Sequence, residues 1–501
     1  MVLRQVAEGQ AGLPVPNSTK SYWHIQPSAK LTGYRSTPEL PPTADTIIVG
    51  TGMTGSFAAR FLKAANPTSH LLVLEAREAC WGATGRNGGH CQPFLYGTSR
   101  EIANFELETY FYLRDLCAKE NIPCDFRPVA GVHAILSDEV WAATKEAVPR
   151  LRTRVPEFAD KIVAVGPEGL VQGGGETWAD GMTLESLRLN QPDVKGAVVQ
   201  KYAASMWPYK LVCWVLEQLV AEYSAETFNL QTNTAVTGVT RDAETGKWVV
   251  QTPRGKVTAN QVLLATNGYT SRLLPAFSDL IVPVRGQIGA LLPPEPRVAL
   301  DYSYVFFGKL KDENGDDTTR DEYLVQRPLP TGELILGGGR HLAKGMAVGE
   351  WRDDSLDEPV ASWLREELEP VLSLDRKADE GQTGASKGLK ASMEWTGIMA
   401  YSRDQVPWIG AVPEALGGGE GLFMAAGFTG HGMPRCALAG RGVARMMTGA
   451  KEGHGLPAAF LASAERAAKA REDWGKVGSV DEMESLMADL KDGEELPVSS
   501  M

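Results

Sequence analysis

Cysteine, histidine and long apolar runs are scarce in this chain. Its 501 residues include six cysteines and seven histidines, with no CxxC pair and no His/Cys spacing typical of a metal site. We therefore expect neither a disulfide framework nor a metal centre. The longest apolar run, residues 211–220, contains Glu217 and Gln218 and is too short to span a bilayer. No membrane segment is predicted.

Positive charge is also in deficit. The formal net charge is −12, and no basic stripe is present to meet phosphates. This argues against a nucleic-acid partner. The first residues, MVLRQVAEGQ, lack the apolar segment of a secretory signal. We therefore expect a globular protein in the cytoplasm.

The two ends of the chain differ in composition from the rest. Residues 1–44 contain six prolines, which disfavour a long helix, but also Tyr22, Trp23 and Ile25. We expect an extended arm that lies across the folded body, with a disordered leader as the alternative. Residues 451–501 are charged and alanine-rich and predict a peripheral helical tail.

A strand–helix–strand pattern begins at Thr46. Residues 46–49 and 71–74 are apolar runs typical of buried strands, and apolar residues recur at helical spacing between them. Such a βαβ unit predicts a parallel sheet with a right-handed crossover.

The turn of this unit reads Gly50-Thr51-Gly52-Met53-Thr54-Gly55. Gly50 permits the tight turn, Gly52 lets the backbone approach a pyrophosphate, and Gly55 lets the helix pack on the strand. The helix start would hold the phosphates, and Glu75, at the end of the second strand, would bond the ribose. An acid there disfavours NADP. The unit alone does not separate NAD from FAD.

Three later stretches favour FAD. The loop Trp81-Gly-Ala-Thr-Gly-Arg-Asn-Gly-Gly-His90 has many small side chains, which let its backbone approach a flat ligand. Residues 263–268 read as a buried strand ending in a small polar turn. Residues 427–432 lie between a strand at 422–426 and a helix that we expect to open with Met433 and Pro434. A helix start beside the flavin pyrimidine would stabilise the charge that builds there on reduction.

These stretches carry a family resemblance. The matching segments are GTGMTG, VLEAREACWGATGRNGGH, LLATNGYT, VPVRGQ, EWTGIMAYSRDQVPWIG and AAGFTGHGMPRCALAGR, which span most of residues 45–447. The chain resembles the FAD-dependent amine and amino-acid oxidoreductases of the D-amino-acid oxidase superfamily, with GATGRNGG most similar to the gamma-glutamylputrescine branch. The resemblance implies that Val236 contacts the adenine side and that residues 427–433 contact the pyrimidine ring.

The fold that follows is α/β: a doubly wound, Rossmann-like FAD-binding domain with an inserted β-rich substrate domain. Strand signals in the inserted part include residues 132–136, 286–292, 323–327 and 334–338, and residues 309–321 predict an exposed hairpin loop. The expected domain limits are 1–44 for the arm, 45–127, 202–275 and 393–450 for the FAD-binding domain, 128–201 and 276–392 for the substrate domain, and 451–501 for the tail.

The predicted cofactor site gathers residues from all of these stretches. They are Gly50, Gly52, Met53, Thr54, Gly55, Glu75, Ala76, Arg77, Gly82, Ala83, Thr84, Arg86, Asn87, Gly88, Gly89, His90, Val236, Ala265, Thr266, Asn267, Gly268, Gly427, Phe428, Thr429, Gly430, His431, Gly432 and Met433.

Two departures from relatives concern covalency and the electron acceptor. Where relatives carry a covalent flavin cysteine or histidine, this chain has no cysteine in residues 394–401 and has Arg86 instead of a histidine. We expect non-covalent FAD, with a link through His90 or Cys91 as the alternative. The position of an oxygen-activating lysine is near Arg340, which leaves the acceptor open between oxidase and dehydrogenase.

Four residues are candidates for the substrate side. Trp395 and Tyr401 would wall the pocket and hold an ammonium by cation–π contact, with a core role as the alternative for Trp395. Arg340 would bind a carboxylate, or form a salt bridge instead. His431 would face the flavin or substrate, or act as a cap.

The predicted function is oxidation of an amine or amino acid to an imine by hydride transfer to flavin. O₂ is the expected acceptor, with H₂O₂ as product. The alternatives are a same-fold dehydrogenase of a hydroxy acid or polyol, and a flavoprotein without turnover.

Overall fold

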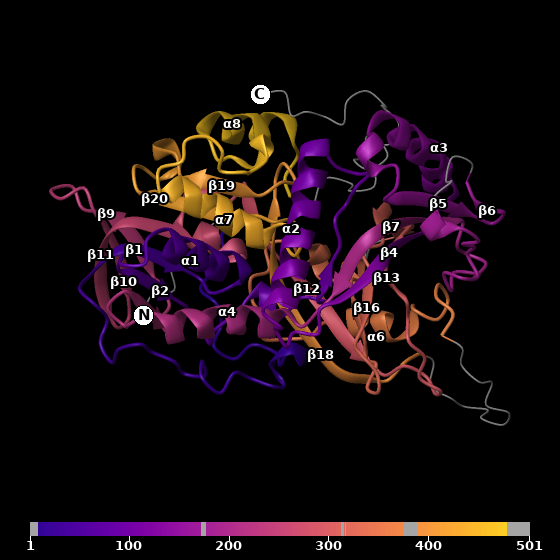
Figure 1. Cartoon of the computed structure of the whole chain (residues 1–501), viewed down its shortest axis with the longest axis horizontal. Helices are drawn as coiled ribbons and strands as arrows, with labels where there is room; N and C mark the ends of the chain where they lie inside the picture. The colour runs from indigo at the N-terminus through magenta and orange to yellow at the C-terminus, as the bar shows by residue number, and fades with distance from the viewer. Residues whose placement is uncertain (1–8, 172–176, 312–314, 316, 375–387, 478–501) are drawn as a thin grey trace.

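The computed structural model describes residues 9–171, 177–311, 315, 317–374 and 388–477. Two large sheets lie beside each other along the long axis of the molecule (Figure 1). Helices and strands alternate in the chain, so the predicted α/β class is confirmed. Within the described residues, no helix combines the length and apolar character needed to cross a membrane.

The first sheet, called here the parallel sheet, has the central order β20-β11-β1-β2-β8, all parallel. Its core strands are short runs of Val, Ile and Leu because both faces are covered. The antiparallel strands β19, β10 and β9 extend it. The strands are β1 (Thr43–Val49), β2 (Leu71–Leu74), β8 (Phe228–Gln231), β9 (Gly238–Arg241), β10 (Trp248–Thr252), β11 (Gly255–Leu264), β19 (Trp408–Ala411) and β20 (Leu422–Ala426).

Helices from distant parts of the chain pack together beside the parallel sheet. α1 (Met53–Ala65) contacts both α4 (Pro208–Glu222) and α7 (Cys436–Met447), and α7 also contacts α2 (Arg100–Lys119). Their apolar residues share one buried cluster. Figure 1 shows α7, in yellow, next to α1 near the start of the chain. The doubly wound, Rossmann-like part is thus assembled from chain segments that are far apart in sequence.

The second sheet, called here the mixed sheet, has the order β18-β12-β17-β16-β13-β4-β7-β5-β6, with β3 paired to β7. The strand signals of the inserted region are confirmed in β4, β12, β16 and β17. The strands are β3 (His90–Cys91), β4 (Arg127–Ile135), β5 (Ile162–Gly166), β6 (Gly169–Leu170), β7 (Gly196–Ser205), β12 (Ile281–Leu291), β13 (Tyr302–Phe307), β16 (Tyr323–Gln326), β17 (Leu334–Gly337) and β18 (Ala391–Ser402).

The remaining elements are short or peripheral. β14 (Lys309–Lys311) and β15 (Asp317–Thr319) form a separate hairpin where a hairpin loop was expected. Much of the expected helical tail lies outside the described residues, which end at residue 477. The other helices are α3 (Asp138–Arg154), α5 (Thr270–Leu273), α6 (Glu358–Glu366) and α8 (Ala464–Asp473).

The described part of the N-terminal arm, residues 9–44, lies against the body. Trp23 has no exposed surface, and the Nε1 group of Trp207 donates a hydrogen bond to its carbonyl oxygen at 2.8 Å. The Nε1 group of Trp23 in turn donates to the carbonyl of Asn87. The arm is therefore in direct contact with the loop after β2.

Two boundaries differ from expectation. The helix after residue 432 begins at Cys436 and not at Met433, because residues 433–435 form a turn in which Gly432 accepts the amides of Arg435 and Cys436. Pro434 therefore precedes the helix. In addition, β18 lies mostly in residues 393–450, but its partner strand is β12 of the mixed sheet. The domain limits remain a proposal.

Candidate functional site

The glycine turn between β1 and α1 is built by close backbone contacts. Gly50 has φ of +107°, and a Cβ there would lie 2.6 Å from the carbonyl oxygen of Ala265. A Cβ on Gly55 would lie 2.0 Å from the carbonyl oxygen of Gly50. Both distances are shorter than any side chain tolerates. The turn can approach β11 and start α1 only with glycine at these positions.

Glu75 follows β2 and closes the same turn. Its Oε2 accepts hydrogen bonds from the amide of Thr51 at 3.0 Å and the Thr51 hydroxyl at 2.7 Å. Its Oε1 accepts from the amide of Arg77 at 3.0 Å. The carboxylate is 8% exposed and lines the cavity described next. Glu75 thus fixes the turn through these hydrogen bonds and also lines the cavity.

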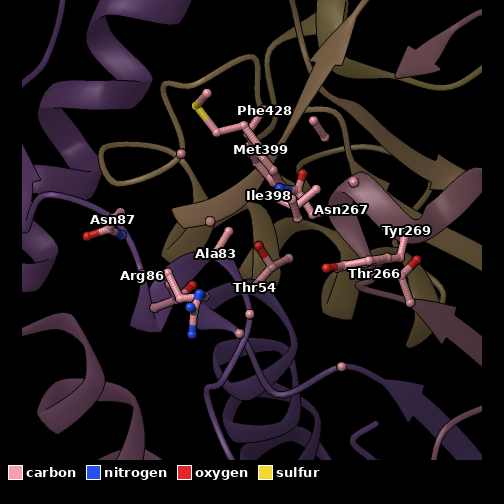
Figure 2. Close-up of a pocket in the computed structure, with 18 of the residues that line it drawn as sticks. Thr54, Ala83, Arg86, Asn87, Thr266, Asn267, Tyr269, Ile398, Met399 and Phe428 are labelled. Atoms are coloured by element: carbon pink, nitrogen blue, oxygen red, sulfur yellow. The ribbon is translucent and has the colours of Figure 1, made fainter. Parts of the chain in front are cut away.

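A cavity of about 400 Å³ runs from this turn into the space between the two sheets. Figure 2 shows its labelled residues converging from the loop at Ala83–Asn87, the turn at Thr266–Tyr269, strand β18 and Phe428. The cavity lining includes most of the predicted site: Gly50, Gly52, Met53, Thr54, Glu75, Ala76, Arg77, Gly82, Ala83, Thr84, Arg86, Asn87, Val236, Ala265, Thr266, Asn267, Gly268, Arg340, Tyr401, Phe428, Thr429, Gly430, His431, Gly432 and Met433.

Six of the predicted residues do not line the cavity. Gly55 packs α1 onto the turn, and Gly427 donates its amide to Oδ1 of Asn267 at 3.2 Å. Trp395 is fully buried and donates its Nε1 hydrogen to the carbonyl of Arg86 at 2.7 Å. The others are Gly88, Gly89 and His90.

Trp395 therefore supports the loop instead of forming a wall of the cavity. The neighbours Gly397, Ile398 and Met399 of the same strand line the cavity in its place. The two residues considered for a covalent link to flavin also lie outside the cavity lining. His90 Nε2 is 2.9 Å from the Ser303 hydroxyl, and Cys91 is fully buried in β3.

A buried ionic network joins the loop after β2 to the arm. Asp353, with no exposed surface, accepts hydrogen bonds from Nη1 of Arg77 at 2.9 and 3.0 Å and lies 3.3 Å from Nε of Arg86. Arg86 also donates to the Thr19 hydroxyl at 2.7 Å and to the Thr396 carbonyl at 2.6 Å. Burial, which outweighs the attraction of Asp353, lowers the pKa of Arg86 to about 10. Arg86 therefore stays charged near neutral pH, and the network brings two guanidinium groups and one carboxylate beside the cavity.

A second ion pair lies on the mixed-sheet side of the cavity. Nε of Arg340 donates to Oδ2 of Asp321, and the guanidinium lies 4.8 Å from the centre of the Tyr401 ring. The side chains of Arg340 and Asp321 are 7% and 19% exposed. Arg340 thus lines the cavity and forms the salt bridge that was the alternative to carboxylate binding.

His431 is a further polar group at this end of the cavity. Its Nε2 is 3.0 Å from Oε2 of Glu106, a fully buried residue of α2. Oε1 of Glu106 accepts from Nε of Arg435 at 2.7 Å, and Oε2 also accepts from the amide of Phe94 at 2.7 Å. Burial acts to raise the pKa of Glu106, but its interactions with His431, Arg435 and the amide of Phe94 hold that pKa below its ordinary value. Glu106 is therefore ionised at neutral pH.

Several lining residues were missed from the sequence. Leu13 and Pro14 come from the arm, and Asp321, Tyr323 and Met399 come from the mixed sheet. Met399 lies in the motif stretch EWTGIMAYSRDQVPWIG, which could have identified it. Nothing in the local pattern marks the other four, because their position depends on how distant segments meet.

Comparisons with known proteins agree with this geometry. The family model DAO, described as FAD dependent oxidoreductase, matches residues 45–446. The chain is 23% identical to gamma-glutamylputrescine oxidoreductase of Escherichia coli (strain K12) over 423 residues, covering 82% of this chain and 85% of that protein. Its fold is similar to glycine oxidase from Geobacillus kaustophilus, with a TM-score of 0.61, 18% identity and coverage of 82% and 96%. It is also similar to L-amino acid deaminase from Proteus vulgaris, crystallised without a specific insertion, with a TM-score of 0.60, 16% identity and coverage of 86% and 96%.

Proposed function

The chain belongs to the DAO family of FAD dependent oxidoreductases, and we propose that it oxidises the C–N bond of an amine or amino acid to an imine. Water then hydrolyses the imine, and O₂ accepts the electrons to give H₂O₂. The observation that carries the proposal is one continuous cavity that connects the glycine turn with the ionic and aromatic groups at Arg340, Tyr401 and His431.

The residues present fit FAD. Gly50 and Gly55 of the turn have no room for a side chain, Glu75 lines the cavity, and Arg77 and Arg86 would offset the negative charge of a diphosphate. FAD, when bound, supplies the acceptor for a hydride from the carbon next to nitrogen. Non-covalent binding is part of the proposal, because His90 and Cys91 lie outside the cavity lining.

The chain contributes position and electrostatics. Tyr323 and Tyr401 are aromatic groups of the lining, suited to an alkyl chain or an ammonium. Met399 and Phe428 add apolar surface that excludes water from the reacting carbon. Proper orientation of the C–H bond is the main requirement for this type of chemistry.

The ion pair at this end favours an ammonium over a carboxylate. Arg340 is already paired with Asp321, so a substrate carboxylate would compete with a resident one. Oδ1 of Asp321 is buried and has no hydrogen-bond partner among the described residues. A buried carboxylate oxygen without a hydrogen-bond partner attracts a hydrogen-bond donor such as the N–H group of an amine. Amines without an α-carboxylate are therefore the preferred substrates in this proposal.

Anaerobic mixing of the FAD-loaded protein with a substrate panel tests the proposal. Mono- and diamines should bleach the flavin absorbance, and hydroxy acids and polyols should not. Bleaching by a hydroxy acid or polyol alone would favour the dehydrogenase alternative, and no bleaching by any compound would favour a flavoprotein without turnover.

Two further measurements test the acceptor and the linkage. Admission of air after bleaching should restore the colour with one H₂O₂ per turnover, whereas reoxidation only by an artificial acceptor would identify a dehydrogenase. Acid precipitation should release all yellow colour into the supernatant. Colour in the pellet would show a covalent flavin.

A further inference from the structure

Glu106 lies on α2, outside the motifs that define the cofactor site, yet its carboxylate reaches the cavity wall. It has no exposed surface and accepts three hydrogen bonds, from His431, Arg435 and the amide of Phe94. Two residues further along α2, on the exposed side of the helix, the side chain of Glu108 is 54% exposed and forms a salt bridge to Arg441 at 2.6 Å. Burial of an ionised carboxylate costs free energy unless the carboxylate is hydrogen-bonded and paired with positive groups.

The carboxylate decides which nitrogen of His431 carries the proton. An ionised carboxylate accepts hydrogen bonds only, so the neutral imidazole must donate from Nε2. Nδ1 then keeps a lone pair. The side chain of His431 is 33% exposed and lines the cavity, and no residue in the described part of the chain is hydrogen-bonded to Nδ1. His431 thus presents a proton acceptor to the cavity.

The other titratable groups near His431 are held in one protonation state by burial. His90 and His133 are close enough to interact with it, and burial lowers the pKa of both to about 3, so they remain neutral. Burial also raises the pKa of Cys436 to about 12. The charged and titratable groups that remain around it are Glu106, Arg435, Asp321, Arg340, Tyr323 and Tyr401, and those elsewhere in the same lining are Glu75, Arg77, Arg86, Tyr269 and Arg272.

Glu106 also stabilises the protonated form of His431. At 3.0 Å its negative charge offsets that of an imidazolium, and Arg435 on the other oxygen keeps the carboxylate ionised. Arg340 is held by Asp321 and remains protonated at all working pH values, so it takes up no proton.

We propose that Glu106 is a positioning residue that orients His431 to take the proton from the substrate ammonium before C–N oxidation. This inference rests on the proposed function, since amines enter mostly as ammonium ions and only the neutral amine can lose a hydride. In the step, an N–H bond of the ammonium breaks, its electron pair stays on nitrogen, and the proton moves to Nδ1 of His431. The proton leaves to water when the product departs.

The tautomer of His431 tests the first half of this proposal without any turnover. FAD-loaded protein labelled with ¹⁵N in its histidine rings has signals from seven histidines, and the H431N variant identifies those of His431. In spectra recorded over a range of pH, the neutral ring should carry its proton on Nε2 and a lone pair on Nδ1. E106Q should weaken this preference, because a glutamine amide donates as well as accepts hydrogen bonds. E108Q is the matched control and should leave the tautomer unchanged, and an unchanged tautomer in E106Q would overturn the proposal.

The pH profile of flavin reduction by an amine tests the second half. E106Q and H431N should slow reduction about 10²-fold or more at neutral pH. Their rates should approach the wild-type rate as the pH nears the pKa of the free amine, and E106D should restore part of the loss. A uniform decrease at every pH would mean that Glu106 is merely structural. If no amine reduces even the wild-type flavin, the proposed function fails, whereas the NMR titration still judges the Glu106–His431 pair.

Discussion

Oδ2 of Asp353 lies 3.3 Å from Nε of Arg86, and neither side chain has any exposed surface. Arg86 belongs to the loop that lines the cavity, and Asp353 also binds Arg77. Through Arg86 the network reaches Thr19 of the arm. These contacts hold the arm, the loop after β2 and the segment near residue 353 together.

D353N should destabilise the holoenzyme by about 3–5 kcal/mol, because two buried guanidinium groups lose their shared counter-charge. Denaturant unfolding monitored by flavin fluorescence measures this. D354N is the control, since Asp354 pairs with the exposed Arg352. Equal stability of the two variants would contradict the assigned role of Asp353.

G55A should abolish FAD binding, because its new Cβ would lie 2.0 Å from the Gly50 carbonyl oxygen and push α1 off the turn. The ratio of flavin to protein absorbance after purification reports the loss. G238A offers a comparison in β9, where a Cβ would come no closer than 3.8 Å to Gln251. Full flavin content in G55A would show that the turn tolerates a side chain.

D321N should change substrate preference. Without the resident carboxylate, the carboxylate of an amino acid no longer competes with Asp321 for Arg340, and an amine loses a negative neighbour. The ratio of kcat/KM for an amino acid to that for its decarboxylated amine should rise on the order of tenfold to a hundredfold. An unchanged ratio would place this ion pair outside substrate recognition.

The stability of the protein should fall as the pH drops from 6.5 toward 3. Burial lowers the pKa of His90 and His133 from 6.5 to about 3, so within this window only the unfolded chain binds their protons. Protons therefore favour unfolding, by about 1.4 kcal/mol per pH unit for each histidine. Above pH 6.5 the two buried histidines no longer make the free energy of unfolding depend on pH.

Denaturant unfolding at several pH values checks this expectation. H133Q should show a shallower dependence on pH than the wild type, and H70Q, at an exposed position, should not. A slope in H133Q equal to that of the wild type would mean that His133 is already protonated in the folded protein.

Local patterns in the sequence were sufficient for the cofactor end of the site. Glycine spacing, the buried strands at 46–49 and 71–74, and the acid at Glu75 act within one βαβ unit, so their geometry follows from short-range sterics. The same holds for the α/β class and for most strands of the mixed sheet, where apolar runs and turn residues occur close together.

The substrate end was decided by tertiary structure. Asp321 meets Arg340 across the mixed sheet, Glu106 on α2 reaches His431, and Trp395 turns away from the cavity to hold Arg86. Each of these contacts joins segments that no local pattern connects, and burial sets the charge states of the groups involved. The sequence alone determined that a flavin nucleotide could be held. Only the packing of distant segments decided which side chains line the far end of the cavity, because desolvation and pairing exist only in the folded chain.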